Sequence, residues 1–279
     1  MKLVRYDIAG TEKPGIMDAT GLLRDLSAQV EDINPALLGN LAALQSIDTA
    51  SLPSITAPYR FAPCVSGTGK FICIGLNYSD HAAETGAKIP PEPIIFMKAT
   101  SAIVGANDNI VIPRHSVKTD WEVELGVIIG KAAKYVVENE AAHHIAGYCV
   151  INDVSEREFQ TAREGQWTKG KSCDTFAPIG PYLVTRDEIS DPQNLKIWLA
   201  VNGQRMQDST TANMVYGADF LVSYLSQFMT LHPGDIISTG TPPGVGLGMK
   251  PPRFLKAGDI ITLGIEGLGQ QQQETISDE

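Results

Sequence analysis

Several features that would place a protein in a membrane or on nucleic acid are missing from this chain of 279 residues. No apolar run approaches the length of a membrane span, and the first residues show no apolar segment typical of a signal peptide. The balance of 22 Lys and Arg against 32 Asp and Glu gives a net charge of −10, which argues against a nucleic-acid surface. We therefore expect a cytoplasmic protein.

Cysteine pairs and nucleotide-binding loops are also missing. The four cysteines form no CxxC pair, so they predict free thiols rather than a zinc site. No GxGxxG follows a strand and no GxxxxGK[ST] is present, which excludes the usual nicotinamide, flavin and P-loop signatures. The Gly- and Pro-rich segment 240–246 could still present backbone N–H groups to an anion.

Two regions of the sequence differ in the secondary structure that their residue patterns predict. Residues 1–65 predict a small N-terminal domain with a strand-like start, helical patterns at 22–30 and 35–46, and a proline-rich connector at 52–63. Residues 66–279 predict a second, larger domain, which is rich in strands. These strands are separated irregularly and alternate with few helices, which indicates a β-rich α+β fold and not a doubly wound βαβ fold.

The clearest predicted elements lie in the second region. Apolar runs predict strands at 71–75, 93–98 and 148–153, and spacing of about four residues predicts a helix at 219–229. Residues 196–207 predict a hairpin, because Asn202-Gly203 suits the two central positions of a type I′ turn.

Apolar and acidic residues alternate in DWEVELGVIIG at 120–130, which is typical of a half-buried strand. Glu122 and Glu124 then share one face, where two carboxylates repel each other. A hard divalent cation such as Mg²⁺ would relieve that repulsion, whereas a solvent-facing edge strand would tolerate it. This stretch alone leaves both interpretations open.

A third carboxylate, Asp153, follows the predicted strand at 148–153. It would complete a three-carboxylate set with Glu122 and Glu124 for one octahedral Mg²⁺. As a lone residue it would more often cap a helix starting near Val154.

His81 and Glu84 are spaced to touch on one helical turn, with Asp80 as its cap. An imidazole held by a carboxylate can activate water, although a lone pair of this kind is usually an ordinary surface pair. The nearby Gly75 and Gly86 favour a shaped loop and therefore a functional role.

Cationic and amide side chains near these acids are further candidates. Lys98 ends an apolar run, Lys171 lies in GKSCD, and Arg157 and Gln160 are three residues apart. Each would need a partner if buried, such as the acidic cluster or a bound carboxylate. The usual alternative is a surface residue with its charge in water.

Five blocks carry a family resemblance. They are NYSDHAAETG (77–86), DWEVELGVIIGK (120–131), AGYCVINDVSEREFQ (146–160), GKSCDTFAPIGPYLVT (170–185) and PGDIISTGTPPGVG (233–246). Their order and spacing across 70–270 resemble the fumarylacetoacetate hydrolase family. The N-terminal stretch resembles a bacterial branch whose members hydrolyse 2,4-diketo-3-deoxy-L-rhamnonate or -fuconate in sugar-acid catabolism. Other relatives are named ureidoglycolate lyase or 2-hydroxyhepta-2,4-diene-1,7-dioate isomerase.

The resemblance implies a fold, an assembly and a set of site residues. The fold would be a mixed β-roll and barrel-like domain preceded by a small N-terminal domain, in a homodimer. Matched positions imply Glu122, Glu124 and Asp153 as Mg²⁺ or Mn²⁺ ligands, and His81, Glu84 and Lys171 as catalytic residues. They imply Tyr78, Lys98, Arg157, Gln160 and Thr241 as substrate-binding residues.

The reaction implied is hydrolysis of a carbon–carbon bond in a 2,4-dioxo acid of the acylpyruvate type, releasing pyruvate and a second acid such as L-lactate. Three alternatives stay open: an oxaloacetate-type decarboxylase, a 2-oxo-dienoate hydratase or isomerase, and a non-catalytic metabolite-binding protein.

Overall fold

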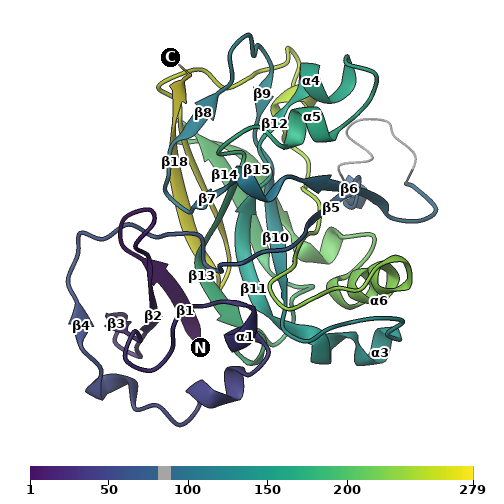
Figure 1. Cartoon of the computed structure of the whole chain (residues 1–279). Helices are drawn as coiled ribbons and strands as arrows, with labels where there is room; N and C mark the ends of the chain where they lie inside the picture. Colours follow the sequence, from purple (N-terminus) through teal and green to yellow (C-terminus); the bar gives the residue numbers. More distant parts are fainter. Residues whose placement is uncertain (81–88, 279) are drawn as a thin grey trace.

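A computed structural model describes residues 1–80 and 89–278. The chain is built mainly from strands, with short helices at the ends and sides of the sheets (Figure 1). No helix among the described residues is long and apolar enough to cross a membrane. The expected β-rich α+β class is confirmed, and the pairings of the described strands leave the sheets open.

The larger sheet has eleven strands and carries the centre of the core. Its order is β4 (Ser54–Ile55), β3 (Leu23–Asp25), β2 (Lys13–Met17), β1 (Lys2–Tyr6), β13 (Ala177–Thr185), β11 (Ile145–Asn152), β10 (Val123–Ile129), β16 (Ile236–Ser238), β5 (Phe71–Gly75) and β6 (Ile94–Lys98), with β7 (Ile103–Gly105) parallel to β13. Every residue of β10 and β11 is buried, because both faces of these central strands are covered.

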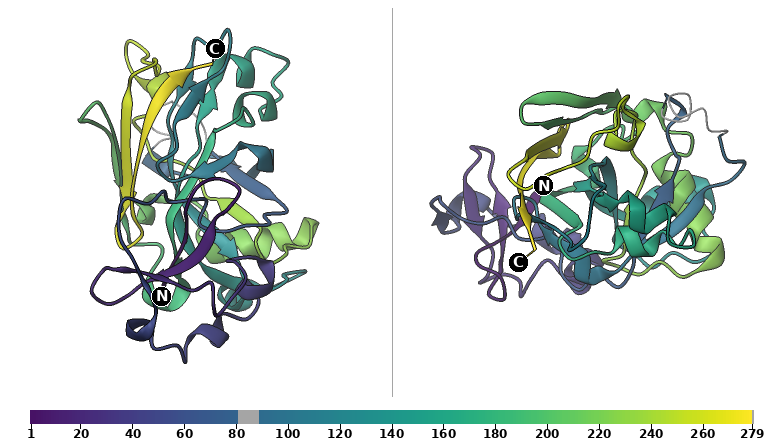
Figure 2. Two further views of the ribbon diagram at one scale, coloured as in Figure 1. Left: turned by 60° about the vertical axis from the view of Figure 1, so that its left-hand side comes forward. Right: turned by 90° about the horizontal axis from the view of Figure 1, so that it is seen from above.

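A second sheet has five strands, in the order β15 (Gln204–Thr210), β14 (Lys196–Val201), β17 (Ile260–Ile265), β18 (Gly269–Ser277) and β8 (Ile110–Ile112). Figure 2 shows its strands β14 and β15, in green, and β17 and β18, in yellow, as a layer beside the larger sheet. The hairpin expected at 196–207 is confirmed, and Asn202 and Gly203 both have positive φ as its turn requires. A small ladder pairs β9 (Thr119–Asp120) with β12 (Ser155–Glu156).

The helices are short apart from α6 (Ala218–Phe228), which confirms the helix expected at 219–229. The other α-helices are α1 (Pro35–Leu38), α3 (Glu138–Ala141), α4 (Arg157–Thr161) and α5 (Thr168–Lys171). The 3₁₀ turns are η1 (Leu41–Leu44), η2 (Thr49–Ser51), η3 (Thr100–Ala102), η4 (Ala142–His144), η5 (Arg186–Glu188), η6 (Thr211–Asn213) and η7 (Gly246–Gly248). Strands β5, β6 and β11 lie where apolar runs predicted them.

The N-terminal segment corrects one prediction. A helix was expected at 22–30, but Leu23–Asp25 form strand β3, because backbone pairing with β2 and β4 outweighs the helical spacing. The expected helix at 35–46 is present only as the short α1 and η1. Strand β1 pairs with β13, so this segment (purple in Figure 1) extends the larger sheet, and a domain boundary at residue 65 stays a prediction.

Candidate metal centre and active site

Strand β10 carries the two alternating glutamates into the interior. It lies between β11 and β16, so the alternative interpretation, a solvent-facing pair on an edge strand, is wrong. Glu122 directly precedes β10 and Glu124 is its second residue, and they are 7% and 2% exposed. One oxygen each from Glu122, Glu124 and Asp153 lie within 4.8 Å of one another.

Asp153 reaches this cluster from the end of β11. Its backbone N–H donates to the carbonyl of Glu122 at 2.8 Å, which fixes the two residues side by side. The cap of the following helix α4 is Glu156, which accepts from the N–H of Glu158, so Asp153 does not serve as that cap. Its carboxylate is left for the cluster.

Three buried cations surround the carboxylates. The Lys171 ammonium donates to Glu122 at 2.6 Å and to Asp153 at 2.7 Å, and Lys98 donates to the other oxygen of Asp153 at 2.5 Å. Arg157 donates to the second oxygen of Glu122 at 2.6 Å. Lys98 and Lys171 are each 2% exposed, so the surface interpretation of these lysines is wrong.

The cluster holds one more acidic side chain than cationic side chains. Four carboxylates (Asp120, Glu122, Glu124, Asp153) face three cations (Lys98, Arg157, Lys171). Burial raises the pKa of Glu122, but Arg157 and Lys171 outweigh it and lower that pKa to about 2. Burial and the neighbouring Asp153 and Glu122 raise the pKa of Glu124 well above its usual range. A hard divalent cation fits this set of oxygen donors, since its positive charge would favour the ionised form of the Glu124 carboxylate.

Arg157 and Gln160 lie together on α4, as their spacing predicted. The Arg157 guanidinium donates to Asp120 at 2.8 Å, to Glu122 at 2.6 Å and to the Gln160 side-chain oxygen at 3.1 Å. Burial lowers the pKa of Arg157, but Glu122 and Asp120 raise it by more, so it stays charged. Three of its five N–H bonds are thus engaged by described residues.

Thr241 and Tyr78, two other predicted substrate-binding residues, differ in their hydrogen bonding. Thr241 donates its hydroxyl hydrogen to the carbonyl of Val123 at 2.9 Å and accepts from Gln207 at 2.8 Å. Tyr78 is fully buried, and its hydroxyl has no hydrogen-bond partner in the part of the chain that the structure describes. Burial, followed by the charges of Glu124 and Asp80, raises the pKa of Tyr78 well above its usual value.

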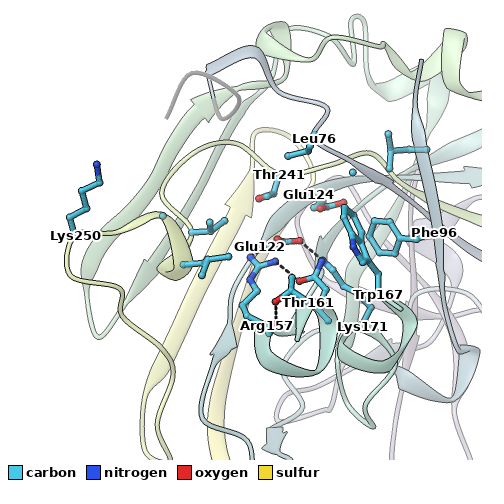
Figure 3. A pocket seen from close by; sticks show the side chains of 16 residues that line it. Leu76, Phe96, Glu122, Glu124, Arg157, Thr161, Trp167, Lys171, Thr241 and Lys250 are labelled. Atoms are coloured by element: carbon cyan, nitrogen blue, oxygen red, sulfur yellow. Dashed lines mark hydrogen bonds and ion pairs between the residues drawn. The ribbon is translucent and has the colours of Figure 1, made fainter. Parts of the chain in front are cut away.

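A cavity of about 490 Å³ opens beside the cluster. Its charged end is formed by Glu122, Glu124, Arg157, Gln160 and Lys171, and its apolar walls by Ile74, Leu76, Phe96, Trp167, Val245 and Leu247. Figure 3 shows Phe96 and Trp167 beside Lys171, while the Lys250 side chain at the rim points away from the carboxylates. Tyr78, Lys98 and Asp153 are buried and are not among the residues that line this cavity.

The predicted water-activating pair, His81 and Glu84, lies outside the described residues, and its role stays a prediction.

Sequence reasoning missed several residues of the site. Asp120 is fully buried against Arg157, and Ser238 and the Gly240 N–H both donate to Glu124, at 2.6 and 2.8 Å. Asp120 could have been found, because it begins the same alternation as Glu122 and Glu124. No local signal marks Ser238 or Trp167.

Comparison with known proteins shows the family. Residues 70–276 match the family model described as fumarylacetoacetate (FAA) hydrolase C-terminal. A Burkholderia lata protein whose name describes it as a hydrolase is 58% identical over 278 residues, covering 99% of each chain. The chain therefore belongs to the fumarylacetoacetate hydrolase family.

Solved structures extend the comparison over the whole fold. A fumarylacetoacetate hydrolase from Exiguobacterium antarcticum is 35% identical with a TM-score of 0.90, covering 100% of both chains. A maleylpyruvate hydrolase from Sphingobium sp. SYK-6, in complex with manganese(II) and pyruvate, is 27% identical with a TM-score of 0.84 and full coverage of both chains. A 2-hydroxyhepta-2,4-diene-1,7-dioate isomerase from Mycobacterium marinum is 30% identical with a TM-score of 0.79, covering 100% of this chain and 99% of that one. These neighbours are hydrolases and an isomerase, and one of them binds a divalent metal.

Proposed function

We propose that this protein is a metal-dependent hydrolase that cleaves the carbon–carbon bond of an acylpyruvate, a 2,4-dioxo acid. We further propose 2,4-diketo-3-deoxy-L-rhamnonate or -fuconate as its substrate, with pyruvate and L-lactate as the products from the rhamnonate. The observation that carries the proposal is the buried set Glu122, Glu124 and Asp153, whose oxygens approach within 4.8 Å at the end of a cavity.

The charge of the cluster suits a 2-oxo acid. Bound Mg²⁺ or Mn²⁺, held by the three carboxylates, would supply Lewis-acid charge at this end of the cavity. The four acids and three cations then reach a net charge of about +1, which complements one substrate carboxylate. Two N–H bonds of Arg157 have no partner among the described residues, so they can donate to that carboxylate.

In the proposed reaction water adds to C4 of the substrate, the C3–C4 bond breaks, and C3 takes up a proton. Pyruvate leaves as an enolate whose negative charge needs a nearby donor. Lys171 uses two of its three N–H bonds on Glu122 and Asp153, so the third can face the enolate oxygen. We assign removal of the proton from water to His81, oriented by Glu84, on the family resemblance.

The apolar walls of the cavity favour a substrate with a short, partly apolar tail. Six apolar side chains line it, and Lys250 is an exposed cation at its rim that points away from the cluster. The lactyl tail of the rhamnonate derivative ends in a methyl group, which such walls can cover. A tail ending in a second carboxylate would find no inward-facing cation among the described residues of these walls.

Substrate profiling tests the proposal. With added Mn²⁺ the protein should release pyruvate from 2,4-dioxo acids, faster with methyl-ended tails than with maleylpyruvate, followed by a coupled lactate dehydrogenase assay. A preference for the dicarboxylate would overturn the proposed tail. Decarboxylation of oxaloacetate without acylpyruvate cleavage would overturn the hydrolase.

Replacing a proposed metal ligand tests the cofactor. Glu124→Gln keeps the size of the side chain but removes its charge, so Mn²⁺ affinity should fall about 100-fold or more, measured by calorimetry. Glu12→Gln, in the N-terminal segment, is the control and should bind Mn²⁺ normally. Unchanged affinity in Glu124→Gln would contradict the ligand assignment.

A second candidate is isomerisation of a 2-hydroxy-dienoate, favoured by the similarity to the Mycobacterium marinum isomerase. Both reactions pass through an enolate of a 2-oxo acid, so the same charged end would serve either. Pyruvate release distinguishes them, because isomerisation breaks no carbon–carbon bond. We also propose a homodimer, as in the family resemblance, which light scattering would test.

A further inference from the structure

Asp120 is a buried carboxylate with all of its acceptor positions in use. One oxygen accepts from the backbone N–H of Trp121 at 2.9 Å and of Gly246 at 2.7 Å. The other accepts from the N–H of Leu247 at 3.0 Å and from Arg157 at 2.8 Å. A carboxylate offers about four such positions, so Asp120 is fully satisfied without any ligand.

The segment bound by Asp120 is a wall of the cavity. Val245, Leu247 and Gly248 line that cavity, and the Trp121 indole N–H adds a bond to the carbonyl of Gly244 at 3.0 Å. Gly246 is held on two sides, since its carbonyl accepts from the N–H of Arg253 at 3.0 Å. The backbone of this wall is thus held by the side chains of Asp120, at the end of β9, and of Trp121.

The spacing at Gly246 leaves no room for adjustment. A Cβ atom there would lie 1.9 Å from the carbonyl oxygen of Arg253 and 2.8 Å from an Asp120 oxygen. Both distances are shorter than real contacts allow. A displacement of Asp120 must therefore displace this wall.

The other side of Asp120 leads to the charged end of the cavity. Arg157 joins Asp120 to Glu122 through adjacent nitrogens, at 2.8 and 2.6 Å. Glu124 of β10 accepts from the N–H of Gly240 at 2.8 Å, so Asp120 of β9 and Glu124 of β10 bind the two ends of the segment 240–247. The alternation of acids at 120, 122 and 124 therefore serves two purposes.

We propose that Asp120 is a positioning residue that sets the distance between the apolar wall and the charged end, and thereby selects the length of the substrate tail. It touches neither the cavity nor the proposed metal, and acts through Gly246, Leu247 and Arg157. Its effect on tail length rests on the proposed acylpyruvate reaction, whereas its hold on the wall does not.

Amide exchange tests the hold on the wall. Asp120→Asn keeps the size of the side chain but turns an NH₂ group toward N–H donors. Exchange of the Gly246 and Leu247 amides with deuterium should then rise about 10-fold, as for the loss of one hydrogen bond.

Asp235 offers a matched control, because it is also 0% exposed and binds the backbone N–H groups of Lys70 and His232 at 2.8 and 2.7 Å. Asp235→Asn should leave exchange at 246–247 unchanged. Equal effects of both variants, or no effect of Asp120→Asn, would overturn the proposal.

Kinetics test the selection of tails. Asp120→Asn keeps the three proposed ligands, so its Mn²⁺ affinity should stay within about 3-fold of that of the parent protein. The ratio of kcat/KM between acetylpyruvate and a longer acylpyruvate should shift about 10-fold, mainly through KM. Equal loss for both substrates would indicate a structural role only and overturn the proposal. If the parent protein cleaves neither substrate, the proposed function fails while the exchange result still stands.

A second pair of variants tests the hold on the wall even if Asp120→Asn folds poorly. Leu247→Pro deletes the backbone N–H that Asp120 accepts, and Leu247→Ala keeps it. Leu247 is 45% exposed, so both variants should fold. Faster exchange at Gly246 in the proline variant alone supports the proposal, and equal exchange in both overturns it.

Discussion

Two arginines in different regions make nearly the same ion pair. Arg5 in the N-terminal segment is 8% exposed and donates from Nε to Asp32 at 2.7 Å. Arg157 on α4 is 6% exposed and donates from Nε to Asp120 at 2.8 Å. Burial and pair geometry alone therefore do not separate a structural arginine from one in a candidate active site.

The surroundings of the two arginines separate them. The remaining contacts of Arg5 go to the carbonyl of Pro63 at 3.2 Å and to Glu12 at 3.9 Å, which tie segments of the fold together. Arg157 continues to Glu122, one of three carboxylates whose oxygens cluster at a cavity. What marks the site is the excess of acids around a cavity, because only that excess leaves a place for a cation.

The largest expected effect is the loss of catalytic efficiency when Arg157 is replaced by glutamine, with the same replacement of Arg5 as the comparison. Arg157→Gln should lower kcat/KM for an acylpyruvate about 100- to 1000-fold, since it removes a charged donor from the proposed substrate end. Arg5→Gln should leave kcat/KM within about 2-fold while lowering the free energy of unfolding by about 1–3 kcal/mol. Equal kinetic losses in the two variants, by the coupled pyruvate assay, would remove the distinction.

Lys171→Met should have the next largest effect. It leaves Glu122 and Asp153 without the ammonium between them, so the free energy of unfolding in urea should fall by roughly 3–5 kcal/mol without metal. Added Mn²⁺ should restore part of that loss. The control is Lys70→Met, which removes an ammonium 2.5 Å from Asp235 and should show no extra rescue by Mn²⁺.

The smallest expected effect concerns pH in the N-terminal segment. Burial raises the pKa of Asp32, but hydrogen bonds from Arg5 and Ser66 lower it below its ordinary value. The folded state then binds fewer protons, so the stabilisation by Asp32 is complete above about pH 4 and is lost as the pH falls through the folded pKa.

The test compares Asp32→Asn with the parent protein in urea. The difference in unfolding free energy should be largest at pH 7 and shrink below pH 4. A difference that stays constant down to pH 3 would show that the charge of Asp32 is not what stabilises the fold.

Strands with strong local patterns could be predicted from the sequence. The apolar runs of β5 and β6 and the Asn202-Gly203 turn are local signals, and each lies where it was expected. The residues at 22–30 were predicted wrongly, because β3 is stabilised by pairing with β2 and β4, which no local pattern encodes. The same limit applies to Ser238, which contacts Glu124 across 114 residues of the chain.

The sequence by itself determined that Glu122 and Glu124 share a face, because side chains alternate along a strand. The sequence also contains the blocks whose family resemblance predicted that Asp153, Arg157, Gln160 and Lys171 belong to one site. Only the tertiary structure decided that β10 lies inside the sheet, that Lys98 and Lys171 are buried, and that Asp120 joins Arg157 to the cavity wall. Burial and charge balance arise from neighbours far away in the chain, so they exist only once the sheets have packed.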